Sequence, residues 1–321
     1  MSQWDKSKTL PKELPLWPGP KLNLFKHHDS PIEWIERLGE YDWRPPYEGY
    51  VFRARIRNRE YAIKVCQSLD THDYAIAFQF RFFDPTANPE HYRLILADPT
   101  LDNIAHYDDP FYNECRAYGR INEYIKKKKS PSLSNIAAPC HGFFFLRPRD
   151  THELERDYHL NVGYGEINVD YQDSTVGGLR PRAIVKDLAP DLYEYWDGKM
   201  LNTMLRGILR LNRHGILNRD IKADNYVGTQ LVDFGRAATM PDLIFDHLPN
   251  WQKPSELHVD LIRFHEMVEN LFNDNFITAE DVRAIRHPMA RRSDPDTSSG
   301  DLLKLLEDNQ DDQDDGGSTE D

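Results

Sequence analysis

The side chains best suited to chemistry lie in one stretch of the second half of the chain, at Asp220, Lys222, Asn225 and Asp233. Phosphoryl transfer needs an aspartate beside the attacking hydroxyl and oxygen ligands that hold magnesium. Asp220 suits the first task, and Asn225 with Asp233 suits the second. Lys222 lies two residues past Asp220, so its ammonium group could neutralise charge that develops on the transferring phosphate. The spacing therefore predicts a magnesium-dependent phosphoryl-transfer site.

Two short motifs contain these residues, and together they resemble protein kinases. Residues 218–225 read Asn-Arg-Asp-Ile-Lys-Ala-Asp-Asn, like a kinase catalytic loop, and residues 233–235 are Asp-Phe-Gly. The resemblance implies that ATP and Mg²⁺ bind here, and Lys222 is typical of serine/threonine kinases. Asn218 departs from the family, which usually has a structural histidine at this place. Each residue taken alone is also a common turn or cap residue, so the interpretation depends on the order and spacing of the whole set.

The residues around the motifs predict the elements that position them. Apolar residues recur at helical spacing through residues 200–211 and stop before Gly215, which predicts a helix that leads into the catalytic loop. Residues 225–227 and 231–232 are short strand-like runs around a turn. We therefore expect the end of the loop and Asp233 to lie on adjacent strands.

Further upstream, alternating residues at 50–56 and 61–65 predict two antiparallel strands. The second strand carries Lys64 and resembles the kinase Val-Ala-Ile-Lys segment. This resemblance implies that Lys64 binds the nucleotide's α and β phosphates and that a helical glutamate, here Glu114, holds it. The alternatives are an ordinary strand-edge lysine and a helix-surface glutamate. The segment between the two residues is longer than kinases normally have, which predicts an insertion.

The glycine-rich loop of kinases is matched least well. Only Gly49 and Val51 align with it, and the glycines here could equally be plain turns. Fewer glycines leave fewer backbone N–H groups free to approach the phosphates. The resemblance therefore implies a cofactor-binding part for Gly49 and Val51 in a reshaped lid.

The hinge that would bind adenine is expected after a strand at residues 182–185, with Val185 as the gatekeeper. By the same resemblance, the backbone from Lys186 to Leu188 would hydrogen-bond the adenine. These assignments depend on order along the chain, and a generic strand-to-loop junction describes the residues equally well.

Residues 259–268 form an amphipathic helical pattern downstream of the motifs. The pattern resembles the kinase helix whose aspartate braces the catalytic loop, with Asp260 in that place, although a helix cap is the alternative. Only about thirty residues follow before the acidic tail, so the helices of the peptide-substrate platform are expected to be missing. The chain thus resembles the compact, atypical branches of the kinase superfamily.

A narrower resemblance covers more of the chain. Residues 18–22, 110–121, 138–142 and 182–188 resemble segments of a fungal kinetochore-subunit-like family (Sim-complex, Fta-type) with kinase-like members. This resemblance implies a fungal source and a protein complex as partner, and it leaves catalytic activity open.

Charge is unevenly distributed along the chain. The net charge is −13, but residues 294–321 hold eleven acids and one lysine, so the rest is nearly balanced. Such a tail is expected to be disordered and solvating. Its apolar island, Leu302–Leu306, offers the alternative that the tail binds a partner. The balanced charge elsewhere gives no support to nucleic-acid binding.

The chain shows no signal-peptide core and no apolar run long enough to span a bilayer. Cys66, Cys115 and Cys140 have neither metal-ligand nor disulfide spacing, so reduced thiols are expected. These features predict a cytoplasmic or nuclear protein that is neither secreted nor bound to a membrane.

The combined expectation is an α+β, bilobal, protein-kinase-like fold with a strand-rich N-lobe and a truncated helical C-lobe. The expected boundaries are a Pro-rich extension at 1–30, the N-lobe with its insertions at 31–185, the C-lobe at 186–292 and the acidic tail at 293–321. The leading functional hypothesis is an ATP- and Mg²⁺-dependent phosphotransferase of the serine/threonine kinase type that acts on a protein substrate. The alternatives are a weak or inactive kinase-like scaffold, which could be kinetochore-associated, and a small-molecule kinase.

Overall fold

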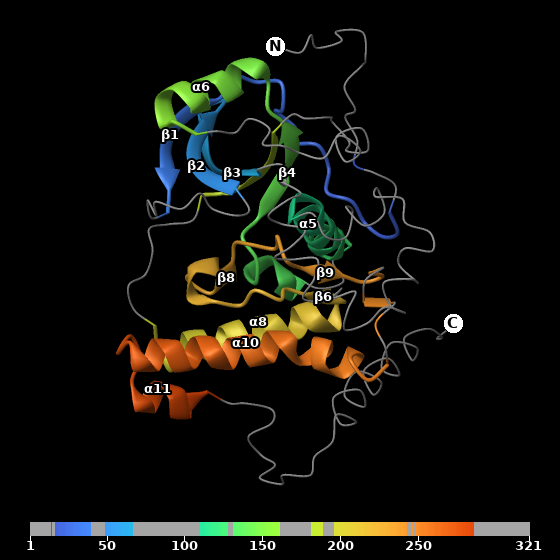
Figure 1. The fold of residues 1–321 in the computed structure, drawn as a ribbon, viewed down its shortest axis with the longest axis vertical. Coiled ribbons are helices and arrows are strands. Elements are labelled where there is room, and N and C mark those ends of the chain that lie inside the picture. Colours follow the sequence, from blue (N-terminus) through green and yellow to red (C-terminus); the bar gives the residue numbers. More distant parts are fainter. Residues whose placement is uncertain are drawn as a thin grey trace, which may run out of the picture.

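Five antiparallel strands form the sheet of the N-terminal half, in the order β1-β2-β3-β5-β4. The structure is a computed structural model. It describes residues 14, 17–39, 49–66, 110–127, 131–160, 181–188, 196–242, 245–246, 248 and 250–285. The strands are β1 (Glu33–Leu38), β2 (Gly49–Ile56), β3 (Arg59–Cys66), β4 (Cys140–Phe145) and β5 (Arg182–Asp187). Figure 1 shows this sheet as the upper part of the molecule.

The two faces of the sheet contribute to two hydrophobic cores. Alternation along β2 and β3 sends Phe52, Ile63 and Val65 to one face, where helix α6 (Pro148–Tyr158) covers them through Leu154. The opposite face belongs to the larger core. Ile184 of β5, which pairs with Lys64 of β3, turns to this face. This division follows from the two-residue period of a strand.

Helix α5 (Pro110–Lys126) lies against that second face and connects the sheet to the helical half (Figure 1). Most of its first ten residues are buried, including the polar side chains Asn113, Glu114 and Arg116. Buried charges need partners, because an unpaired charge in a protein interior carries a large desolvation cost. The partners of these three residues define the site described below.

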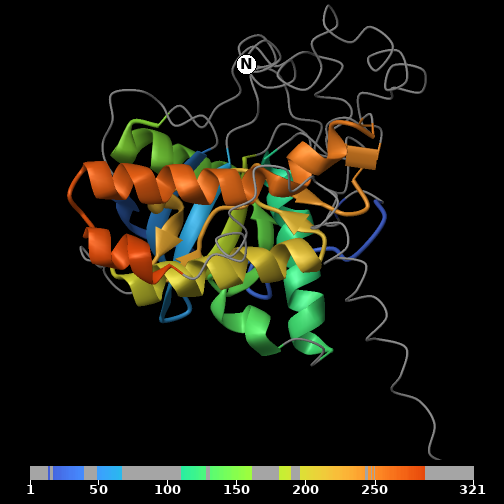
Figure 2. The same ribbon diagram turned by 90° about the horizontal axis from the view of Figure 1, so that it is seen from below.

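The C-terminal half is built on two long helices that run alongside each other, α8 (Gly198–Arg213) and α10 (Lys253–Asn273), with the short α11 (Ala279–Ala284) packed on α8 (Figures 1 and 2). Asp197 caps α8 by accepting a hydrogen bond from the Met200 N–H at 2.6 Å. The short elements between the helices are β6 (Ile216–Leu217), η2 (Ala223–Asn225), β7 (Tyr226–Val227), β8 (Gln230–Leu231) and β9 (Ala238–Thr239), and η1 (Pro131–Asn135) precedes β4.

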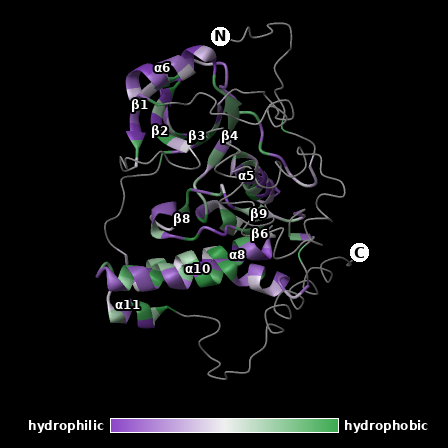
Figure 3. Cartoon of the chain, viewed as in Figure 1, coloured by the Kyte–Doolittle hydropathy of each residue, from purple (hydrophilic) through white to green (hydrophobic). Residues whose placement is uncertain are grey.

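Hydropathy along α8 and α10 follows the same arrangement. Hydrophobic and hydrophilic residues alternate around both helices (Figure 3), and the buried residues of α10 include Leu261, Phe264 and Met267. After α10, the described residues add only α11. This antiparallel sheet over a smaller helical half is the bilobal α+β arrangement that the sequence predicts.

The predicted strands and helices are found, but β5 extends two residues further than expected, to Asp187, and α10 is much longer than the predicted pattern. The expectation that the end of the loop and Asp233 lie on adjacent strands is wrong, because Asn225 belongs to η2 and Asp233 follows the end of β8. The expected insertion between Lys64 and Glu114 lies mostly outside the described residues, as do the loop at 40–48, Ala189 and Pro190, and the acidic tail. Cys66, Cys115 and Cys140 are free and buried. Within the described ranges, no helix has the length and apolar character needed to cross a membrane.

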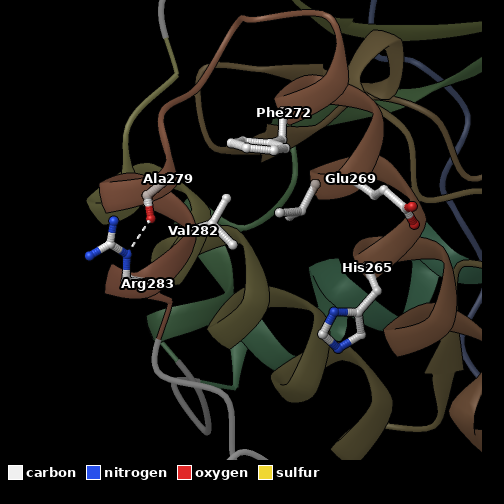
Figure 4. A pocket seen from close by; sticks show the side chains of 7 residues that line it. His265, Glu269, Phe272, Ala279, Val282 and Arg283 are labelled. Atoms are coloured by element: carbon white, nitrogen blue, oxygen red, sulfur yellow. Dashed lines mark hydrogen bonds between the residues drawn. The ribbon is translucent and has the colours of Figure 1, made fainter.

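A hollow of about 460 Å³ lies between α10 and α11 (Figure 4). His265, Glu269 and Phe272 line it from α10, and Val282 and Arg283 line it from α11. None of the residues predicted to do chemistry belongs to this hollow. The candidate site lies instead between the sheet and the catalytic loop.

Candidate active site

Two lysines point from the sheet toward α5. In the strand register Lys64 of β3 pairs with Ile184 of β5, and Ala62 pairs with Lys186. Paired residues of adjacent strands share a face, and so do residues two apart along one strand. Lys64 and Lys186 therefore lie on the same face, and both are almost fully buried.

Glu114 of α5 lies between these lysines and is fully buried, with 0% of its side chain exposed. Its Oε2 atom is 3.2 Å from Lys64 Nζ, and its Oε1 atom forms an ion pair with Lys186 Nζ. Lys186 Nζ also donates a hydrogen bond to the Val232 carbonyl at 2.5 Å. The carboxylate of Glu114 is thus shared by two ammonium groups.

Asp233 lies on the other side of Lys64. Lys64 Nζ donates to both carboxylate oxygens of Asp233, at 2.7 and 2.8 Å, and the Gly235 N–H donates to one of them at 2.8 Å. Burial alone would raise the pKa of Asp233, but the nearby charges of Lys64 and Lys186 and these hydrogen bonds lower it to about 2. Asp233 is therefore a carboxylate at neutral pH.

The catalytic-loop residues gather around Asp220. Asn225 Nδ2 donates to the Asp220 carboxylate at 2.9 Å and to its carbonyl at 2.7 Å. Lys222 Nζ lies 3.3 Å from the same carboxylate, and the Arg236 guanidinium lies 3.6 Å from its other oxygen. The loop thus presents one carboxylate flanked by two cations and an amide.

Asn218 performs the connecting task that was expected of a histidine. Its Nδ2 donates to the Asp233 carbonyl at 2.8 Å, and its Oδ1 accepts from the Asp220 N–H at 3.1 Å. Because an amide has both a donor and an acceptor, one buried asparagine can link the loop at 218–225 to the Asp-Phe-Gly segment. The departure from the kinase pattern at Asn218 therefore leaves this connection intact.

Asp260, in the first half of α10, supports the backbone of the loop at 218–225. Its carboxylate accepts hydrogen bonds from the Asn218 N–H at 2.8 Å and from the Arg219 N–H at 2.6 Å. Arg219 has a φ of 66°, a conformation that is unfavourable for a side-chain-bearing residue unless its surroundings hold it. The Arg219 guanidinium also pairs with Glu256 of α10 at 3.3 Å. Asp260 therefore acts as a structural brace, and the helix-cap alternative is wrong because the residue lies inside α10.

We predict a pH dependence of stability from Asp260. Burial raises the pKa of Asp260 to about 6 from its ordinary value of 3.8, although the N–H groups of Arg219 and Asn218 oppose the rise. Because the folded state holds this proton more tightly than the unfolded state does, the free energy of unfolding falls as pH rises between these two values. The expected loss is at most about 3 kcal/mol in the free energy of unfolding between pH 4 and pH 6.

Urea unfolding of the wild type and Asp260→Asn across this pH range measures the effect. The asparagine cannot accept both N–H bonds, so a constant loss of stability is expected, but the decline assigned to Asp260 should be absent. Asp233 contributes in the opposite direction and only below about pH 4, because its pKa is lowered. Parallel curves for the two proteins from pH 4 to pH 7 would refute the assignment.

The other predicted nucleotide-binding residues are placed as follows. Val51 pairs with Lys64 across β2 and β3, and Gly49 pairs with Cys66. A Cβ atom on Gly49 would lie 2.2 Å from the Val65 carbonyl oxygen, and its φ is 141°, so the strand itself requires glycine here. Leu188 directly follows β5, outside the sheet. The loop that would cover a nucleotide lies outside the described residues.

The assignment of Lys186 to the hinge backbone is wrong in this structure. Lys186 lies inside β5, where it pairs with Ala62 on one side and Cys140 on the other, and Asp187 donates its N–H to the Pro139 carbonyl at 2.9 Å. The backbone of a central strand is occupied by its neighbours. It is the side chain of Lys186 that enters the site. Because successive side chains of a strand point to opposite faces, the apolar residues 183 and 185 indicate that Lys186 turns to the other face of the sheet.

A second buried ion pair was not predicted. Arg116 of α5 pairs with Asp242 at 3.0 Å, and both side chains are at most 2% exposed. Arg116 also donates to the carbonyls of Thr239 and Pro241, at 2.5 and 2.6 Å. Asn113, three residues earlier, donates to the Gly235 carbonyl at 3.1 Å. One face of α5 thus holds the chain that follows Asp-Phe-Gly.

The residues present are of the chemical kind that holds Mg²⁺ in phosphoryl-transfer sites. Within the described part of the chain, no cluster of three or more His, Cys, Asp or Glu side chains could hold a metal. Mg²⁺ in phosphoryl-transfer sites is held by one or two protein oxygens together with phosphate and water oxygens. The Asp233 carboxylate and the Asn225 amide oxygen could supply these. The Val232 N–H donates to the Asn225 carbonyl at 2.9 Å and keeps the two segments adjacent.

Comparisons with known proteins show a family and distant structural likenesses, one of which is described here. The structure of vaccinia related kinase 3 is 9% identical, with 94% of each chain covered and a TM-score of 0.36. No curated protein matches this chain. The model of the family described as kinetochore Sim4 complex subunit FTA2 matches residues 10–238, which are more than half of the chain. This span includes Lys64, Glu114, Asp220 and Asp233, and the protein belongs to the kinetochore Sim4 complex subunit FTA2 family.

Proposed function

We propose that this protein is a phosphotransferase that binds ATP with Mg²⁺ between its two lobes and transfers the γ-phosphoryl group to a hydroxyl. The observation that carries the proposal is the position of Lys64 between Glu114 and Asp233. A strand lysine held by a helix glutamate, beside the metal-binding aspartate, is the arrangement that a kinase requires for transfer. Lys222 supports a serine or threonine hydroxyl of a protein as the acceptor.

Each residue has a defined task in the proposed reaction. Asp220 orients the acceptor hydroxyl and accepts its proton, and the Asn225 bond fixes the direction of its carboxylate. Lys64 and Lys222 stabilise negative charge on the phosphates as the transition state forms. Asp233 and Asn225 would hold the Mg²⁺ ion, which would neutralise negative charge on the phosphates.

Thermal unfolding with and without Mg²⁺-ATP tests the nucleotide site without knowledge of the acceptor. ATP at ten times its dissociation constant should add about 1.4 kcal/mol to the free energy of unfolding and raise the melting temperature by a few degrees. We expect Lys64→Ala and Asp233→Ala to abolish the rise, because each removes a group that faces the phosphates or the metal.

Lys127→Ala is the matched control. Lys127 is exposed, lies just past the end of α5 and forms an ion pair with Glu123, one turn earlier. This variant should keep the full rise. If the wild type shows no rise at millimolar ATP, the proposed function is wrong.

A second candidate function is favoured by the family. Members are described as subunits of the kinetochore Sim4 complex, and we propose that this chain also works in the nucleus as part of such a complex. Asp220 is flanked by Lys222 and Arg236, which could restrain it as a base. A chain that carries both Asp220→Asn and Asp233→Asn would separate the two candidates when its assembly with partner proteins and its function in cells are measured. Retained function favours the scaffold, and lost function favours catalysis.

A further inference from the structure

The distribution of charge around Lys64 differs from that of a site with a single lysine. The buried group consists of two ammonium groups, Lys64 and Lys186, and two carboxylates, Glu114 and Asp233. In a site with one lysine, that lysine must neutralise the helix glutamate, and Asp233 then depends on a metal ion. Here the described charges are already balanced before any ligand binds.

The distances show which lysine serves which carboxylate. Lys64 Nζ is 2.7 and 2.8 Å from the two oxygens of Asp233 but 3.2 Å from Glu114. Lys186 is in direct contact with Glu114 and is fixed there by the Val232 carbonyl. The ring of Tyr118 lies 5.5 Å from Lys186 Nζ, which closes that side with an aromatic face. Lys186 is thus the nearer of the two counter-ions of Glu114, and Lys64 lies closer to Asp233.

We propose that Lys186 enables this site to bind the phosphates of a nucleotide without a divalent metal, an inference that rests on the proposed nucleotide site. Because Lys186 neutralises Glu114, the charge of Lys64 is available to Asp233 and to an incoming phosphate at the same time. Lys64 then bridges carboxylate and phosphate, which is the electrostatic part that Mg²⁺ otherwise takes. Lys186 itself is a positioning residue that acts through Glu114.

Burial makes the balance strong. Lys64 and Lys186 are 4% and 7% exposed and Glu114 is 0% exposed, whereas Asp233 is 26% exposed and borders the open side. Charges in such surroundings interact far more strongly than charges in water. Removal of one ammonium group must therefore redirect the other toward the carboxylate that has lost its partner.

Calorimetric titration with ATP, in EDTA and in excess Mg²⁺, tests the proposal in the wild type and in Lys186→Met. The wild type should bind ATP in EDTA. In Lys186→Met, Lys64 must serve Glu114, so affinity for ATP in EDTA should fall by about tenfold or more. Affinity for Mg²⁺-ATP should change little, because the metal can neutralise Asp233. The ratio of the two dissociation constants is a readout that a general loss of folding would not change selectively.

Two further variants make the result specific. Glu114→Gln combined with Lys186→Met removes one acid and one base, so Lys64 can again serve Asp233 and the phosphates, and binding in EDTA should return. Lys127→Met, at an exposed lysine just past the end of α5, controls for loss of one positive charge. If the wild type binds Mg²⁺-ATP but not ATP in EDTA, or if Lys186→Met keeps the wild-type ratio, the inference is wrong and the proposed function stands. If the wild type binds neither form, both are wrong.

Discussion

Replacement of Asp220 by asparagine is expected to lower the rate of phosphoryl transfer by a factor of about 10²–10⁴, which is the usual contribution of a positioned general base. The substitution keeps the size and shape of the side chain. An asparagine oxygen can still accept the bond from Asn225, so the loop geometry should persist. The acceptor hydroxyl, however, would have no carboxylate beside it to accept its proton.

The measurement is transfer of the labelled γ-phosphoryl group of ATP to the chain itself, to a protein acceptor or to water. Binding of Mg²⁺-ATP should be largely kept, because in the proposed reaction Asp220 faces the acceptor hydroxyl, whereas Lys64 and Asp233 face the phosphates and the metal. Asp224→Asn is the matched control, since Asp224 is an exposed residue of the same loop. Turnover by Asp220→Asn at the rate of the Asp224→Asn control would show that Asp220 is not the base.

The parts of this fold that short-range patterns specify could be predicted from the sequence. Alternation located β2 and β3, helical spacing located α8, and the spacing of the loop motif predicted that Asp220 and Asn225 lie together, as their hydrogen bond shows. Such patterns are local consequences of strand and helix periods. The pairing of Lys64 with Glu114 also followed from the motif, although more than forty residues separate them.

The residues that escaped prediction are charged groups that become buried only through tertiary contacts. Lys186 looked like the end of an apolar strand, because a lysine is rarely buried unless it is paired. Its partner Glu114 lies on a different element, so no local pattern announces the pair. The same holds for Arg116 and Asp242, which are 126 residues apart. Sequence spacing gives no sign of such pairs, and they need the packing of α5 to appear.

Replacement of Arg116 by methionine is expected to lower the free energy of unfolding by about 3–5 kcal/mol, because it leaves the Asp242 carboxylate buried without its counter-ion. The melting temperature should fall by about 10 °C. Arg116 also holds the Thr239 and Pro241 carbonyls, so the loss extends to the whole segment after Asp-Phe-Gly. Chemical denaturation and hydrogen exchange of residues 237–242 measure the two effects.

Arg263→Met is the control, because Arg263 forms an exposed pair with Glu266 at 2.7 Å on α10. Exposed pairs contribute at most about 1 kcal/mol. Combining Arg116→Met with Asp242→Leu should recover part of the loss, since the buried charge is then gone. Wild-type stability of Arg116→Met would show that the pair is not a buried anchor.

The Arg116 pair also bears on how the site is kept ready. Kinase activation loops are often ordered by an added phosphate that pairs with arginine. Here a carboxylate of the chain already occupies the arginine of α5. The same helix carries Glu114, so its two buried charged residues hold the lysines of the sheet on one side and the segment after Asp-Phe-Gly on the other. Loss of Arg116 should therefore weaken nucleotide binding as well as folding, and a Mg²⁺-ATP titration of Arg116→Met below its melting temperature would show whether the two ends of α5 are coupled.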